Sequence, residues 1–81
     1  MQTPSFDIYP QPAKEQFIIS TNGYTIKNIS MCNMLGQQVK NQEVNSSNIT
    51  LNVSNLPKGI YNLIIKMSDN TTYYKKIVVA Q

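Results

Sequence analysis

The chain has no histidine, no tryptophan and no arginine, and its one cysteine is Cys32. Without histidine it lacks the commonest general base and the commonest metal ligand. A lone cysteine cannot form an internal disulfide, and its ordinary role is that of a small apolar residue on a strand. The four carboxylates stand in separate segments of the sequence. We therefore predict that the chain is not an enzyme and binds neither a metal nor a cofactor.

Charge is also scarce, since 14% of the residues are charged and the net charge is +3. All seven basic residues are lysines, and apart from Lys75 and Lys76 they are dispersed along the chain. Arginine favours bidentate contacts with bases and phosphates, so its absence argues against a nucleic-acid partner. No run approaches the roughly 20 apolar residues of a membrane span, and the first residues lack the basic-then-apolar order of a signal peptide. We expect no nucleic-acid binding and no membrane span.

The sequence does contain enough apolar residues for one small core. Its 81 residues suit a single domain, and 41% of them are hydrophobic. With only two phenylalanines, the core must rest mainly on Ile, Val, Leu and the five tyrosines. A domain of this size is only marginally stable, so its strands and turns must agree with one another.

Alternation of apolar and polar residues recurs in short bursts separated by Asn, Ser, Gly and Pro, and this pattern favours strands over helices. The bursts predict seven strands, at residues 6–9, 16–20, 24–34, 37–44, 49–53, 60–67 and 72–79. Residues 60–67 have apolar side chains at both parities, which indicates a central strand. The connections are short, so we expect an all-β fold of about seven strands, an immunoglobulin-like antiparallel β-sandwich. The Asn, Ser and Ser at 45–47 are expected to form a turn.

Four segments place Pro, Gly or a basic residue beside apolar residues at the ends of these strands. They are Ile8-Tyr9-Pro10-Gln11-Pro12-Ala13, Leu35-Gly36-Gln37-Gln38-Val39, Leu56-Pro57-Lys58-Gly59-Ile60-Tyr61 and Lys75-Lys76-Ile77-Val78-Val79. Proline fixes φ and cannot donate to a ladder, while glycine allows unusual backbone angles. The Pro and Gly residues therefore have a structural role in fixing turns, through which any recognition would act indirectly.

In this order and spacing, the four segments resemble the C-terminal sorting domains of the type IX (Por) secretion system of Gram-negative bacteria. The first segment is similar to the family's Tyr-Pro-Asn-Pro-Ala, with Gln11 where Asn is usual. The second is similar to Gly-Gln-x-Val and the third to Leu-Pro-x-Gly-x-Tyr. The fourth is similar to the family's terminal basic residue followed by β-branched residues. Cys32 stands where an aromatic residue is common. The resemblance covers residues 6–81, so we interpret residues 1–5 as a linker remnant or the start of an excised fragment.

The resemblance implies a sorting signal that directs a larger cargo protein across the outer membrane through the type IX translocon. The N-terminal cargo domains would be periplasmic in transit and then at the cell surface or secreted, usually after a sortase-like peptidase removes the signal. The alternative is a non-catalytic immunoglobulin-like module that binds carbohydrate or protein, or spaces domains. The candidate recognition residues are Tyr9, Pro10, Pro12, Ala13, Gly36, Val39, Leu56, Pro57, Gly59, Tyr61, Lys75, Lys76, Ile77, Val78 and Val79.

Physical reasoning adds expectations about the last strand. We hypothesise that this strand and its neighbouring edge form the recognition surface by strand addition. Lys76 is the residue most readily given a recognition role, because Ile77 and Val79 already supply packing. Tyr61 is expected to pack inside the domain. Exposed edge strands also predict a strand-exchanged or edge-paired dimer of the isolated domain.

Overall fold

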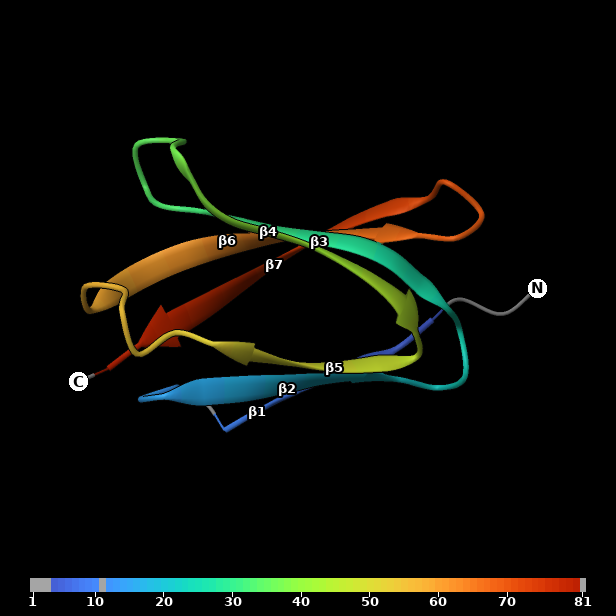
Figure 1. The fold of residues 1–81 in the computed structure, drawn as a ribbon, viewed down its shortest axis with the longest axis horizontal. Helices are drawn as coiled ribbons and strands as arrows, with labels where there is room; N and C mark the ends of the chain where they lie inside the picture. Colours follow the sequence, from blue (N-terminus) through green and yellow to red (C-terminus); the bar gives the residue numbers. More distant parts are fainter. Residues whose placement is uncertain (1–3, 11, 81) are drawn as a thin grey trace.

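The computed structural model describes residues 4–10 and 12–80, in which seven strands form two sheets. The strands are β1 (Phe6–Tyr9), β2 (Gln16–Thr21), β3 (Ile26–Cys32), β4 (Gln38–Ser46), β5 (Asn48–Asn52), β6 (Gly59–Met67) and β7 (Thr72–Val79). One sheet has the order β1-β2-β5 and the other the order β4-β3-β6-β7. All five strand pairs are antiparallel. The predicted seven-stranded antiparallel sandwich is confirmed, and the two sheets face each other as its layers (Figure 1).

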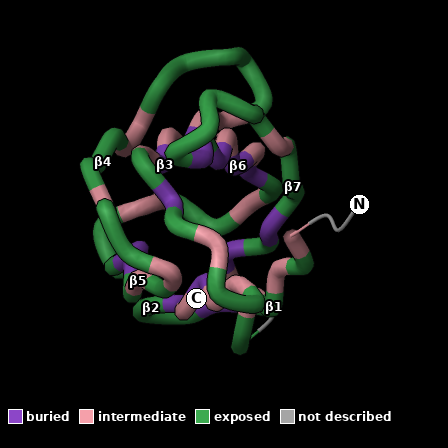
Figure 2. Tube along the Cα trace, turned by 90° about the vertical axis from the view of Figure 1, so that its right-hand side faces the viewer, coloured by how far each residue is buried: buried purple, intermediate pink, exposed green. Residues whose placement is uncertain are grey.

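The core lies between the two sheets and is built by alternation along each strand. In β6, Tyr61, Leu63, Ile65 and Met67 are buried and the residues between them are not. Because successive side chains of a strand point to opposite faces, each strand contributes one row to the core. Figure 2 shows these buried positions between the layers. The largest fully buried side chains are Phe17, Ile19, Ile26, Ile29, Met31, Leu51, Leu63, Ile65 and Ile77.

Strand β6 lies between β3 and β7, so its predicted central position is confirmed. The apolar residues on its second face have a different environment from the first. Ile60 is 46% exposed and Ile64 is half-buried, and both lie on the outer face of the four-stranded sheet. The second apolar row of β6 therefore contributes to the surface of the molecule and not to a second core.

Strand boundaries differ from the predicted ones where side chains take over backbone hydrogen bonds. Strand β3 was expected to begin at residue 24, but the Thr21 hydroxyl donates a hydrogen bond to the Tyr24 carbonyl (2.6 Å) and holds that residue in the connection. The turn expected at residues 45–47 is wrong in part, because Asn45 and Ser46 continue β4. Asn45 has a φ of 52° and lies at an irregularity of the β3–β4 ladder, which absorbs the extra residue.

Some expectations fall on residues outside the described part of the chain. Most of the expected linker remnant lies in residues 1–3, and Gln11 of the first segment is also outside the described residues. Within the part that is described, no helix is long and apolar enough to cross a membrane.

Candidate functional site

The four motif segments are far apart in the sequence but lie at one end of the sandwich, on the left in Figure 1. The strand register fixes this arrangement. Gln16 at the start of β2 pairs with Asn52 at the end of β5, and Gly59 at the start of β6 pairs with Val79 at the end of β7. We call residues 9–10, 12–15, 32–38, 53–62 and 76–80 the motif end. Residues 4–7, 20–28, 43–48 and 66–72 form the opposite end, here called the far end.

The first segment carries the chain from one sheet to the other. After β1, with a cis Tyr9–Pro10 peptide bond, the chain reaches Ala13, which forms a parallel bridge with Val79. The Ala13 amide donates to the Val78 carbonyl (2.9 Å), and the Ala80 amide donates to the Ala13 carbonyl (2.7 Å). Ala13 is only 1% exposed, so a small side chain is needed at this crossing. The segment thus fastens the end of β7 to the opposite sheet.

The second segment forms the β3–β4 hairpin tip, which Asn33 holds in shape. Its Oδ1 accepts hydrogen bonds from the Leu35 and Gln37 amides, both at 3.0 Å. Its own amide donates to the Gln37 carbonyl (2.9 Å), and its Nδ2 donates to Gln37 Oε1 (3.0 Å). Gly36 has a φ of 84°, a conformation that glycine adopts without strain. The tip therefore presents Met34 and Leu35 to solvent on a fixed backbone, at 63% and 84% exposure.

The third segment forms the β5–β6 connection, and Tyr61 anchors it. The Tyr61 hydroxyl donates to the Pro57 carbonyl over 2.6 Å, while the ring lies in the core at 4% exposure. Leu56 packs partly against the same core. Gly59 begins β6 with a φ of 154°, in a region that side chains with a Cβ rarely adopt. The expectation that Tyr61 packs inside the domain is confirmed, so it has no surface from which to contact a partner.

Replacing Tyr61 by phenylalanine tests this anchor. The ring stays in place, but the Pro57 carbonyl loses its donor, so the free energy of unfolding of the 81-residue chain should fall by about 1 kcal/mol. Urea denaturation measures the change. Tyr74→Phe is the matched control, because Tyr74 is 71% exposed and should change stability by less than about 0.5 kcal/mol. Equal stability of the Tyr61→Phe and unmodified chains would contradict the anchoring role.

The terminal strand β7 separates Lys75 and Lys76 onto opposite faces. Lys75 lies on the side of the buried Ile77 and Val79, at the rim, where its Nζ is 5.7 Å from the centroid of the Phe6 ring. Phe6 also stacks in a tilted arrangement on Tyr73, with ring centroids 5.3 Å apart. Lys76 is exposed on the outer face, opposite Asn62. Lys75 therefore contacts the domain itself, and Lys76 is available to a partner.

Strand β7 is an edge strand whose outward side is only partly covered, and it runs along the same side of the sandwich as β1 (Figure 2). The Val78 carbonyl, bound by Ala13, points away from β6. Because orientation alternates along an antiparallel strand, the backbone groups of Tyr74 and Lys76 point the same way. Among residues 4–10 and 12–80, no backbone hydrogen bond to these two positions comes from that side. Ala13 occupies this side at Val78 and Ala80, so strand addition would have to occur earlier in β7, at Thr72, Tyr74 and Lys76.

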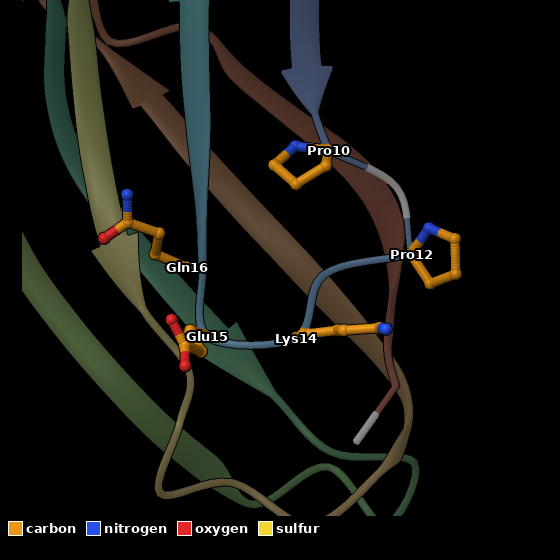
Figure 3. Close-up of a pocket in the computed structure, with 5 residues that line it drawn as sticks. All are labelled: Pro10, Pro12, Lys14, Glu15 and Gln16. Carbon is orange, nitrogen blue, oxygen red and sulfur yellow. The ribbon is translucent and has the colours of Figure 1, made fainter.

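Metal-ligating side chains are dispersed over the described part of the structure. The described residues contain no group of three or more potential metal ligands. A hollow of about 460 Å³ is lined by Pro10, Pro12, Lys14, Glu15 and Gln16. In Figure 3 the Lys14 amine and the Glu15 carboxylate, which both line this hollow, point away from each other.

The structure brings most of the predicted recognition residues to the motif end, and two lie elsewhere. Val39 is half-buried against the core in β4, and Lys75 lies on a middle row of the four-stranded sheet, opposite Leu63. Ala13, Tyr61, Ile77 and Val79 belong to the motif end but are buried. Met34 and Leu35, both exposed at this end, are absent from the predicted recognition residues. Their signal is the placement of two adjacent apolar residues directly before a turn glycine.

Comparison with known proteins identifies the family. Residues 7–80 match the model of the secretion system C-terminal sorting domain, Por_Secre_tail. The chain belongs to this family. It is 32% identical over 79 residues to the ulvan lyase NLR42 of Nonlabens ulvanivorans, a match that covers 96% of the chain and 15% of the lyase. The chain therefore spans less than a fifth of that relative's length, and the match carries no activity over to it.

A solved structure supports the fold assignment. A DUF3244 family protein from Bacteroides vulgatus, with an immunoglobulin-like β-sandwich fold, superposes with a TM-score of 0.71 at 16% identity, covering 94% of this chain and 95% of its own. At that identity the likeness shows the fold alone. The family match in turn confirms the resemblance to a sorting domain of the Por (type IX) secretion system. A sorting domain of this family implies cargo that is secreted or associated with the cell surface.

Proposed function

We propose that this domain is the sorting signal that directs an N-terminal cargo protein through the type IX translocon and across the outer membrane. The convergence of the four motif segments at one end of the sandwich carries the proposal. Strand β1 begins at the far end, so cargo joined ahead of Phe6 would leave the motif end accessible. A carbohydrate-binding or spacer module would have no need to gather these segments at one end.

The cargo and its processing follow from the same proposal. The sorting-domain family and the ulvan lyase relative support a secreted enzyme of that kind as one class of cargo, periplasmic in transit and then at the surface or released. The sorting domain itself contributes no catalysis. A sortase-like peptidase would cut ahead of β1, where residues 1–5 are the candidate linker.

Recognition by the translocon is proposed to include the outward side of β7. The open backbone groups of Tyr74 and Lys76 offer hydrogen bonds to an added strand, and the exposed Lys76 side chain offers a positive charge beside them. The same open edge could pair with a second copy of the chain, so we predict an edge-paired or strand-exchanged dimer of the isolated domain. Sedimentation of the 81-residue chain measures its oligomeric state.

Fusion of the chain to a periplasmic reporter, in a bacterium that has the type IX machinery, tests the proposed function. The unmodified fusion should reach the cell surface or medium. Lys76→Ala should reduce delivery by roughly tenfold, the factor that corresponds to about 1.4 kcal/mol of lost charged contact. The matched control is Lys66→Ala, which removes an exposed lysine from the same outer face at the far end. Full retention of the unmodified fusion in the periplasm would refute the function. Equal delivery by the two variants would refute the role of Lys76.

A further inference from the structure

Exposed large apolar side chains are distributed unevenly over the molecule. Six such residues occur in the described part of the chain: Tyr9, Met34, Leu35, Ile60, Tyr74 and Val78. All except Tyr74 lie at the motif end, and none lies at the far end. Single exposed apolar residues are normal on a protein surface, but several gathered together mark an interaction site.

Charged side chains are also unevenly distributed between the two ends of the sandwich. The motif end carries Lys14, Lys58, Lys76 and a single carboxylate, Glu15. The far end carries Asp7, Glu43 and Asp69 against Lys27 and Lys66. The remaining lysines, Lys40 and Lys75, lie on the middle row of the four-stranded sheet. The motif end is therefore the positive end of the molecule, and a partner surface that fits it would be acidic.

The most exposed apolar residues are also held in a fixed position. Met34 and Leu35 lie at the hairpin tip that Asn33 stabilises through hydrogen bonds with Leu35 and Gln37. A tip that is already ordered loses little conformational entropy on binding, so its apolar side chains are suited to act as anchors. By contrast, the far-end connections present polar residues such as Asn22, Ser68 and Asn70 to solvent.

We infer that the motif end is a docking surface for a protein of the secretion machinery whose contact face is apolar at its centre and acidic around it, with Met34 and Leu35 as the anchors. This inference rests on the proposed function and adds the apolar hairpin tip to the contact proposed for the open edge of β7. A protein fits better than a lipid surface because the exposed apolar residues do not share one plane. The hairpin tip lies at the end of the sandwich, whereas Ile60 and Val78 pair on the outer face of a sheet.

An export experiment with the full-length parent protein tests the docking surface. The variants are Met34→Ser with Leu35→Ser, and Lys58→Glu, with Lys27→Glu as the matched charge reversal at the far end. Because Met34 and Leu35 are exposed, the double variant should fold. Protease resistance of the domain in the periplasm checks that it does. The double variant should lower surface delivery by about tenfold or more and Lys58→Glu by several-fold, while Lys27→Glu leaves it unchanged. Normal export of the folded double variant would overturn the docking surface. Failure of the unmodified parent to be exported would overturn the proposed function instead.

Photocrosslinking in the same cells identifies what the surface contacts. Benzoylphenylalanine placed at position 35 should form an ultraviolet-dependent adduct with a protein of the secretion machinery, and the same probe at position 71 of the far end should not. Equal adducts from both positions, or none from position 35 in cells that export the parent, would overturn the inference. Binding of the parent to phosphatidylglycerol–phosphatidylethanolamine vesicles that is lost in the double variant would show a lipid partner and overturn it as well, whereas no vesicle binding supports the protein partner.

Discussion

Deletion of residues 75–81 is expected to unfold the whole domain and thereby to abolish export. Strand β7 pairs with β6 from Gly59 opposite Val79 to Lys66 opposite Thr72, and the deletion removes more than half of this ladder. It also removes Ile77 and Val79 from the core, where each is 1% exposed. Burial of each such side chain contributes about 1.5–3 kcal/mol. An 81-residue domain has roughly 4–12 kcal/mol of stability in total, so this loss is comparable to the whole.

Circular dichroism and urea denaturation of the truncated chain measure the effect. We expect loss of the β-sheet signal and of the cooperative unfolding transition. Lys75→Ala with Lys76→Ala is the control, because it removes both charges of the terminal segment and keeps the buried Ile77 and Val79. A truncated chain that still unfolds cooperatively, at a urea concentration close to that of the full chain, would show that β7 is dispensable for the fold. Because the deletion removes the fourth motif segment and part of the core together, export of the truncated protein must be interpreted with these folding measurements.

The sequence predicted the strands well where the signals are local. Residues 6–9 and 72–79 coincide with β1 and β7, because the adjacent prolines and the turn at Asp69 and Asn70 interrupt the alternating pattern at fixed residues. The boundaries of β3 differ from the prediction because side-chain hydrogen bonds of Thr21 and Asn33 decide them. Strand β4 runs past residue 44 because the irregularity at Asn45 absorbs an extra residue. The division of the strands between two sheets depends on contacts between distant segments, which local alternation does not encode.

The sequence also contains a signal for the meeting of the motif segments at one end, namely the number of each strand that a segment follows or forms. The segments follow the first, third and fifth strands and form the last one. When successive strands alternate in direction, the ends of all odd-numbered strands lie on the same side, so parity alone predicts the motif end. The separation of Lys75 from Lys76 follows in the same way from the alternation of side chains. The contact of Lys75 with Phe6 could not be predicted, because it joins strands of different sheets.

Replacing Phe17 by alanine is expected to be the most damaging single substitution. Phe17 is fully buried in β2, opposite Leu51, and is the only phenylalanine of the described core with no exposed surface. Truncation of a buried phenylalanine to alanine costs about 3–5 kcal/mol, since the removed ring leaves a cavity. In a domain of this size each kcal/mol lowers the melting temperature by roughly 4–8 °C. We therefore expect the melting temperature of the chain to fall by about 12–40 °C, as followed by circular dichroism.

The same substitution tests whether the translocon recognises the folded domain or a linear peptide motif. Phe17 lies outside all four motif segments, so a translocon that read only those segments as an extended peptide would export Phe17→Ala normally. If the translocon recognises the folded domain, export of the fusion should fall with the fraction of folded domain at the growth temperature. Ile18→Ala is the matched control on the same strand, because Ile18 is half-buried on the opposite face and its loss should leave the domain folded and exported. Export of Phe17→Ala at the level of Ile18→Ala, in cells where its domain is protease-sensitive, would show that the fold is not what the machinery recognises.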